Sequence, residues 1–127
     1  MIVAGFGYRT GVSPEDIERA LEAALQGTRT SQDQLSLMAF PALRGSEAMI
    51  VLASSRRVPL QAVSQCDLEA ASERTLTRSE RAKAALNVDC VAEAAALAAA
   101  GCGARLLAPR IAVGSVTCAL AARDPNT

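Results

Sequence analysis

The stretch Gly5-Phe6-Gly7-Tyr8-Arg9 brings two glycines, a phenol and a guanidinium together within five positions. It follows the apolar run Met1 to Ala4, which predicts a buried strand that Gly5 and Gly7 end in a turn. Loops that follow strands are the usual ligand sites of α/β folds. Glycines let a ligand approach closely, and an arginine can bind a carboxylate with two hydrogen bonds. We therefore predict that Gly5, Gly7 and Arg9 bind a ligand, although a tight turn with a solvated Arg9 remains the alternative.

The spacing of these glycines does not match the dinucleotide-binding fingerprint. That motif needs a third glycine three residues after Gly7, where this chain has Thr10, and Gly11 stands one position too late. We therefore disfavour a dinucleotide as the ligand.

A lone carboxylate, Glu93, lies early in the apolar segment Val91 to Leu97. An acidic residue in the first turn of a helix is favoured by the helix dipole, so a structural role explains it. The functional alternative is that Glu93 faces a cleft and acts as an acid, a base or a hydrogen-bond acceptor. Glu93 is thus the candidate catalytic residue of the chain.

Several further basic residues stand near expected helix or strand ends. Arg78, Arg81 and Lys83 cluster in one segment, which is most often explained by a solvated helix face. A basic lip over a ligand with several carboxylates would use the same residues. Arg44, just before Gly45, and Arg110, just after Pro109, allow the same two interpretations.

The composition excludes several classes of chemistry. The 127 residues fit one domain, and they include no histidine, which rules out His-based acid–base catalysis, Ser-His-Asp triads and most zinc and haem sites. The four cysteines form no CxxC pair and are expected to act as small buried hydrophobes. We therefore predict neither a metal site nor a cofactor.

Charge and hydropathy narrow the partners. Thirteen basic and thirteen acidic residues give a formal charge of zero, and only three residues are aromatic, so nucleic-acid binding is not expected. The first residues lack the basic region of a signal peptide, and no apolar run is long enough to cross a bilayer. We expect a cytoplasmic protein without membrane contact.

Helix and strand signals alternate along the chain. The clearest helix starts at Ser13-Pro14, with Ser13 as N-cap, and ends at Gly27. Capping patterns also begin at Ser64 and Thr77, Asp89 can cap a later helix, and Asn87 and Gly101 fit helix ends. We expect strands at 1–4, 35–40, 60–63, 105–109 and 115–122, and further helices at 46–57, 64–71, 77–86 and 90–100. In the helix at 46–57, Met49, Ile50, Leu52 and Ala53 are expected to face inward.

This order predicts an α/β fold with three layers, α/β/α. The sheet is expected to be mixed but mostly parallel, with about five strands, because strands alternate with helices. The last two strands, separated by a short loop containing Gly114, predict a C-terminal antiparallel hairpin.

The combined pattern resembles the CobE and CbiG C-terminal domain family of cobalamin (vitamin B12) biosynthesis. The resemblance is carried by Gly5-x-Gly7-x-Arg9, the helix start Ser13-x-x-x-Ile17, the block Val91 to Leu97, Leu106-Leu107-x-Pro109-Arg110, and Val116-Thr117-x-Ala119. It covers residues 1–127 in order as a single domain. One departure is Arg44, where the family often has lysine.

The resemblance implies a role around corrin ring contraction. The first hypothesis is a protein that binds or hands over a carboxylated tetrapyrrole of the precorrin or hydrogenobyrinic acid type, with Gly5, Gly7, Arg9, Arg44, Arg110 and Thr117 as ligand-binding residues. The second is a hydrolase or lyase acting on a precorrin lactone or acyl group, with Glu93 as acid–base. The third is a scaffold that docks on other cobalamin-pathway enzymes.

Overall fold

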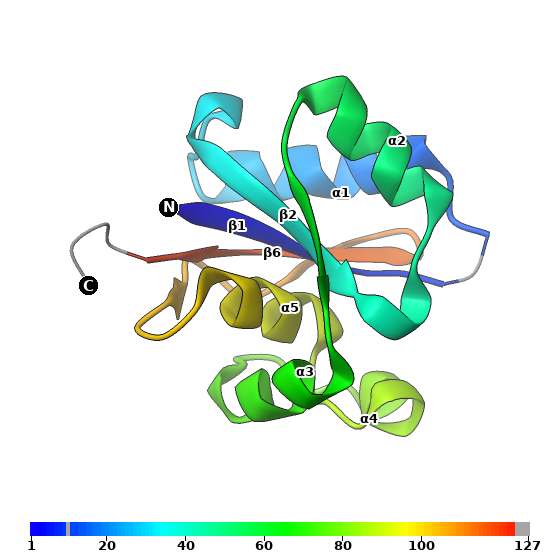
Figure 1. Ribbon diagram of the computed structural model, residues 1–127, viewed down its shortest axis with the longest axis vertical. Coiled ribbons are helices and arrows are strands. Elements are labelled where there is room, and N and C mark those ends of the chain that lie inside the picture. Colours follow the sequence, from blue (N-terminus) through cyan, green and yellow to red (C-terminus); the bar gives the residue numbers. More distant parts are fainter. Residues whose placement is uncertain (10, 124–127) are drawn as a thin grey trace.

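The computed structural model describes residues 1–9 and 11–123, which fold into strands and helices that alternate through most of the chain (Figure 1). The strands are β1 (Ile2–Gly7), β2 (Leu35–Pro41), β3 (Leu60–Val63), β4 (Arg105–Leu106), β5 (Ile111–Val113) and β6 (Val116–Ala122). The helices are α1 (Pro14–Gly27), α2 (Glu47–Arg56), α3 (Gln65–Ala71), α4 (Glu80–Leu86) and α5 (Val91–Ala100).

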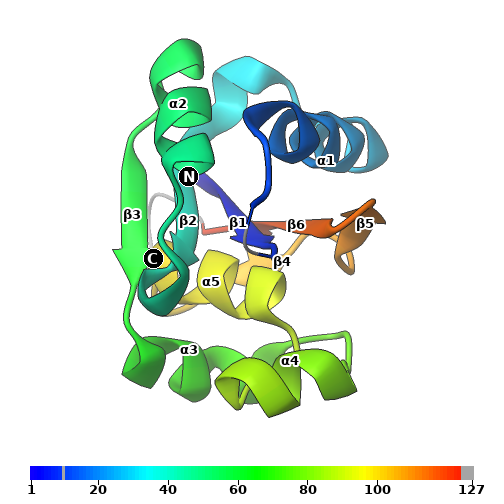
Figure 2. The same cartoon turned by 90° about the vertical axis from the view of Figure 1, so that its right-hand side faces the viewer.

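The strands of this part of the chain form one mixed six-stranded sheet in the order β3-β2-β1-β6-β4, with β5 also paired to β6. β1, β2 and β3 are parallel neighbours, whereas β6 runs antiparallel to β1, β4 and β5. Figure 2 shows α1 and α2 on one face, and α5 on the other with α3 and α4 beyond it. The predicted three-layer fold is confirmed, with six strands instead of about five.

The two larger hydrophobic clusters of the described residues lie on opposite faces of the sheet. One joins Phe6, Met38 and Leu120 to the inner sides of α1 and α2, and the other joins Val3 and Val63 to α3 and α5. Met49, Leu52 and Ala53 point inward as expected, but Ile50 is 56 % exposed, so its predicted inward position is wrong. Only one side of α2 packs against the rest of the protein, and Ile50 lies on the opposite, outer side.

Several helix ends are set by the side chains that the sequence indicates. Ser13 and Ser64 accept hydrogen bonds from the backbone N–H of Asp16 and Asp67, each three residues on. Asn87 ends α4 in the left-handed conformation. The helix expected at 46–57 is also present, with Ser46 as N-cap.

Other expected ends are wrong. Ser79, not Thr77, caps α4, because Thr77 bonds to Glu93 instead. Cys90 is the N-cap of α5, while Asp89 accepts a hydrogen bond from Ser72 and pairs with Arg78. α1 does end at Gly27 as expected, but its C-cap is Thr28, and the left-handed residue that follows is Arg29.

The C-terminal hairpin is present, but its first strand differs from the prediction. The segment 105–109 forms a strand only at β4, and the strand joined to β6 by the turn at Gly114 is β5. β4 and β5 pair with different parts of β6, β4 with Ala121 and Ala122 and β5 with residues 116–118. The loop between them carries Arg110.

Gly5 lies inside β1, and the strand continues to Gly7, its last residue, which corrects the turn predicted to begin at Gly5. A Cβ at Gly5 would lie 2.2 Å from the carbonyl oxygen of Ala92 and 2.4 Å from the backbone nitrogen of Ala96. The absence of a side chain therefore lets α5 pack directly on the backbone of β1. Gly5 serves helix–strand packing.

Replacing Gly5 by alanine should destabilise the protein by about 3 kcal/mol or more, because the new methyl group meets helix backbone that cannot rotate away. Urea unfolding of the purified variant measures this change.

Gly45→Ala is the matched control. There the added Cβ would meet only Phe40 at 3.7 Å, and φ is −55°, so a change within about 0.5 kcal/mol is expected. Equal unfolding midpoints for the two variants would contradict the close packing of β1 and α5.

Candidate functional site

A cavity of ≈ 640 Å³ opens where β1 and β2 end, between these strand ends, α4 and the β5–β6 turn. Gly7 and Pro41 are the last residues of β1 and β2, and Thr117 lies near the start of β6. The carboxyl ends of parallel strands are the usual ligand position in α/β sheets. The cavity therefore lies where this fold class places its ligands.

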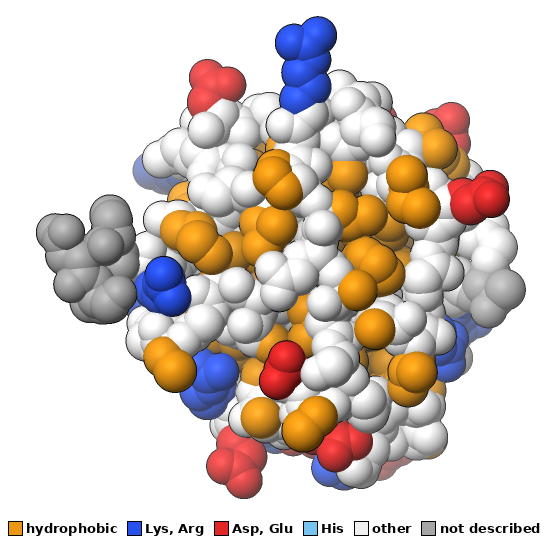
Figure 3. Space-filling model, viewed as in Figure 1, with side chains coloured by type: hydrophobic (Ala, Val, Ile, Leu, Met, Phe, Trp, Pro, Cys, Tyr) orange, Lys and Arg blue, Asp and Glu red, His pale blue; other side chains and the backbone are white. Residues whose placement is uncertain are grey.

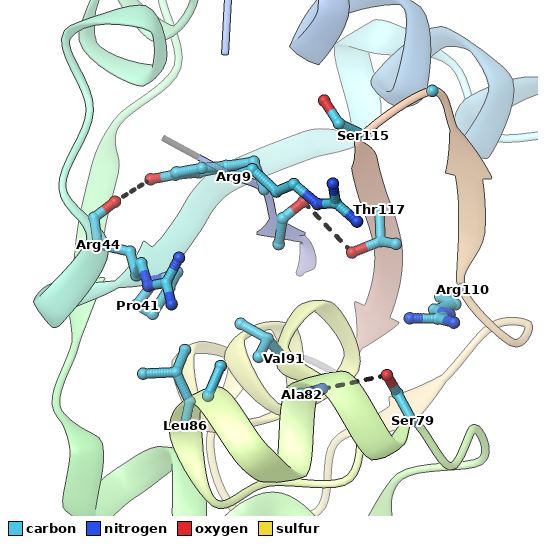
Figure 4. A pocket seen from close by; sticks show the side chains of 14 residues that line it. Arg9, Pro41, Arg44, Ser79, Ala82, Leu86, Val91, Arg110, Ser115 and Thr117 are labelled. Atoms are coloured by element: carbon cyan, nitrogen blue, oxygen red, sulfur yellow. Dashed lines mark hydrogen bonds between the residues drawn. The ribbon is translucent and has the colours of Figure 1, made fainter. Parts of the chain in front are cut away.

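Three arginines from three separate segments surround this cavity: Arg9 after β1, Arg44 after β2, and Arg110 before β5. Figure 4 shows Arg44 and Arg110 on opposite sides, with Arg9 between them. Among the described residues, none of the three side chains forms an ion pair. The lining residues that the structure describes include no aspartate or glutamate, so their net charge is positive.

The rest of the lining is divided between apolar and hydroxyl groups. Ala82, Ala85 and Leu86 of α4 and Val91 of α5 form an apolar floor. Ser79, Ser115 and Thr117 add hydroxyl groups, and the Thr117 hydroxyl donates to the carbonyl oxygen of Gly7 at 3.3 Å. The cavity can thus contact a flat apolar body and the anionic groups at its edge.

Tyr8 ties two of the arginine-bearing segments together. Its hydroxyl donates a hydrogen bond to the carbonyl oxygen of Arg44 at 2.6 Å. Burial raises the pKa of Tyr8 to about 12, against the opposing effect of the Arg44 charge. The phenol therefore stays protonated at neutral pH and holds the loop after β2 against the end of β1.

Glu93 lies inside the protein and does not line the cavity. Its side chain is 0 % exposed. One carboxylate oxygen accepts from the backbone N–H of Leu76 and Thr77, at 2.7 and 2.9 Å, and the other from the Thr77 hydroxyl and the backbone N–H of Arg110, at 2.7 and 2.8 Å. The expectation that Glu93 faces a cleft is therefore wrong.

The electrostatics of Glu93 follow from these contacts. Burial alone would raise its pKa, but the hydrogen bonds from Thr77, Arg110 and Leu76 outweigh burial and hold the pKa below the usual 4.5. Glu93 is thus ionised at neutral pH, with its lone pairs directed to protein donors. It anchors the backbone of Arg110, and so fixes one wall of the cavity.

The structure brings five of the seven predicted site residues to one cavity: Gly7, Arg9, Arg44, Arg110 and Thr117. Gly5 and Glu93 lie outside its lining. Of the basic cluster on and before α4, Arg78 pairs with Asp89, Lys83 does not line the cavity, and the side chain of Arg81 is outside the described residues.

The sequence analysis missed the other lining residues, apolar and hydroxyl-bearing, including Leu86, Ser79 and Ser115. No local motif marks these residues, because they come together only when α4 and the β5–β6 turn meet the ends of β1 and β2. Within the described residues there is no group of His, Cys, Asp or Glu that could hold a metal ion. The helices of that same part of the chain are all too short or too polar to cross a membrane.

Comparisons with known proteins agree on one family. The sequence model of the family described as Cobalamin synthesis G C-terminus matches residues 2–121. The crystal structure of CobE, a protein from the cobalamin (vitamin B12) biosynthetic pathway, is 31 % identical with a TM-score of 0.89, over 95 % of this chain and 89 % of that chain. The crystal structure of cobalamin biosynthesis protein chiG from Agrobacterium tumefaciens str. C58 is 34 % identical with a TM-score of 0.77, over 95 % of this chain and 97 % of that chain. Comparison with curated proteins gave no match.

The geometry around Glu93 makes a prediction about stability. In Glu93→Gln, an NH2 group replaces one carboxylate oxygen and faces N–H or O–H donors, to which it cannot bond. We therefore expect the free energy of unfolding, measured with urea at neutral pH, to fall by about 3 kcal/mol. Glu80→Gln, a substitution of an exposed glutamate on α4, is the control and should stay near wild type.

We also predict that the stability difference between wild type and Glu93→Gln depends on pH. Because the pKa of Glu93 is lower in the folded than in the unfolded protein, its contribution is complete above the unfolded pKa and is lost as the pH falls through the folded pKa. The difference in the free energy of unfolding between wild type and Glu93→Gln should therefore become smaller as the pH is lowered from neutral to about pH 3. A difference that stays constant over this range would show that Glu93 is not held as an anion.

Proposed function

We propose that this cobalamin biosynthesis protein, a member of the Cobalamin synthesis G C-terminus family, binds a carboxylated tetrapyrrole intermediate in the cavity at the ends of β1 and β2. Ligands of the precorrin or hydrogenobyrinic acid type fit the proposal. They are flat apolar rings with carboxylates around the edge. The role is that of a protein that binds or hands over an intermediate around corrin ring contraction.

The observation that carries the proposal is the set of three arginines around one cavity whose described lining has no acidic residue. Arg9, Arg44 and Arg110 come from segments far apart in the sequence, so their charges meet only here. Without ion-pair partners among the described residues, they remain available for ligand carboxylates. Three separated cations suit a ligand with several peripheral acids better than one with a single acid.

The apolar floor supports the same proposal. Leu86, Val91 and the alanines of α4 offer small side chains against which the face of a ring can lie. Gly7 presents no side chain at the cavity wall, which brings the ring within reach of Tyr8 and Thr117. Burial of a large flat ring against such a surface adds hydrophobic free energy to the contacts of its carboxylates.

The geometry favours binding over acid–base catalysis. A hydrolase or lyase reaction on a precorrin lactone needs a group that exchanges protons with the substrate. Glu93 is buried and accepts hydrogen bonds from four donors. Among the described residues, the cavity lining has arginines and hydroxyls but no carboxylate, cysteine or histidine. Docking on other pathway enzymes, and a cytoplasmic location, stay predictions.

Titration with hydrogenobyrinic acid, followed by its visible spectrum, tests the proposal. Arg9→Gln, Arg44→Gln and Arg110→Gln should each weaken binding about tenfold, since a hydrogen bond to a charged group contributes about 1.5 kcal/mol or more. Binding to the wild type should also weaken as salt is added, because the contacts are ionic.

Arg19→Gln is the matched control, because Arg19 lies on α1, is 69 % exposed and pairs with Asp16. This variant should bind like wild type. A wild-type spectrum that does not change at tens of micromolar ligand, or equal affinities for all four variants, would refute the proposed site.

A further inference from the structure

Strand β3 leaves one edge of the sheet unpaired within the described residues. It pairs only with β2, whereas the opposite side of the sheet is covered in two short pieces by β4 and β5. An open strand edge is a template for pairing with another strand. Figure 2 shows β3 at the outer edge of the sheet, beside α2.

The hydrogen bonds to β2 identify which backbone groups of β3 face outward. The backbone N–H of Met38 donates to the carbonyl oxygen of Pro59, and Met38 is the Cα partner of Leu60. In a parallel ladder this places Pro59 and Gln61 toward β2, so the N–H and C=O groups of Leu60 and Ala62 point away from the sheet. Four backbone groups in two alternate residues are thus free to pair with a further strand.

The side chains around this edge do not protect it. Natural edge strands usually carry charges, a central proline or a bulge, yet the exposed residues of β3 are Gln61 and Ala62. On α2, Ile50 and Val51 are 56 % and 53 % exposed. Figure 3 shows apolar side chains gathered over the middle of this face. This edge therefore combines open backbone groups with an apolar surface.

The charges at the two ends of β3 have opposite signs. The exposed Arg57 precedes the strand, and the exposed Asp67 and Glu69 follow it on α3. Neither Arg57 nor Asp67 forms an ion pair among the described residues. An antiparallel copy of the same edge brings the basic end of each strand to the acidic end of the other, whereas a parallel copy would place like charges together. The edge is thus complementary to itself.

We propose that two copies of this chain associate through β3, antiparallel about a two-fold axis, so that the two sheets join into one. The register that uses all outward groups pairs Leu60 with Ala62 of the partner subunit and Ala62 with Leu60 of the partner subunit. The axis then passes at Gln61. In this register Arg57 lies opposite Gln65 of the partner subunit, two positions from Asp67 of the partner subunit.

Sedimentation over a range of protein concentrations tests the association. We expect a monomer–dimer equilibrium in the micromolar range, since the strand is short and the interface small. Arg57→Glu should raise the dissociation constant about tenfold, because two symmetric attractions become repulsions. Arg57→Glu combined with Asp67→Arg should restore it. Arg29→Glu is the matched control, since Arg29 is also exposed and left-handed but lies on none of β3, α2 and α3.

Cysteine cross-linking tests the register. The exposed Cys66 and Cys102 are first replaced by serine, while Cys90 and Cys118 are buried and stay. In that background Gln61→Cys places two thiols directly opposite each other, in a pair whose Cα atoms are about 4.5 Å apart and within disulfide range. With diamide as oxidant, this variant should form a covalent dimer. Ala62→Cys should not, because it faces Leu60 of the partner subunit.

A protein that stays monomeric up to millimolar concentration would overturn the proposal. So would a dimer that Arg57→Glu leaves unchanged, or one in which Ala62→Cys cross-links and Gln61→Cys does not. None of these results depends on tetrapyrrole binding, because the residues changed do not line the cavity. Failure of the dimer and failure of the binding site are therefore separate outcomes.

Discussion

The hydrogen bonds accepted by the buried carboxylate of Glu93 are the interaction on which the geometry of the cavity depends. Through four hydrogen bonds, Glu93 joins α5 to the segment Leu76–Thr77 and to the backbone of Arg110, and Glu93 itself is fully buried. A buried anion is tolerated only when such donors replace water. The positions of these two loops are thus coupled to a helix in the core.

That coupling rests on how closely α5 approaches the sheet. Gly5 lets the backbone of α5 contact β1, and the alanines of α5 keep the distance small. With the helix fixed against the centre of the sheet, Glu93 holds the Arg110 loop while Tyr8 holds the Arg44 loop. The Arg44 and Arg110 loops, which are far apart in the sequence, are thereby held beside one cavity by contacts within the protein. A preorganised site loses less free energy on binding than loops that must become ordered.

Local patterns in the sequence account for most of the elements. Serine caps, apolar periodicity and strand-forming runs act within a few residues, so α1, β2, α2, β3 and α3 are close to their predicted bounds. The wrong ends share one cause. Thr77 and Asp89 could cap helices locally, but their side chains bond to Glu93 and to Ser72, partners 16 and 17 residues away. Competition from distant partners is invisible to a local pattern.

The sequence by itself determined the α/β class, the alternation of strands and helices over most of the chain, the absence of histidine chemistry and the arginines that surround the cavity. Only the tertiary structure decided what the two most suggestive residues do. Gly5, taken for a ligand contact, packs against a helix, and Glu93, taken for a candidate acid or base, is saturated by internal donors. The reason is that residue type limits the contacts a side chain can form. Which of them it forms is set by the segments that the fold brings beside it.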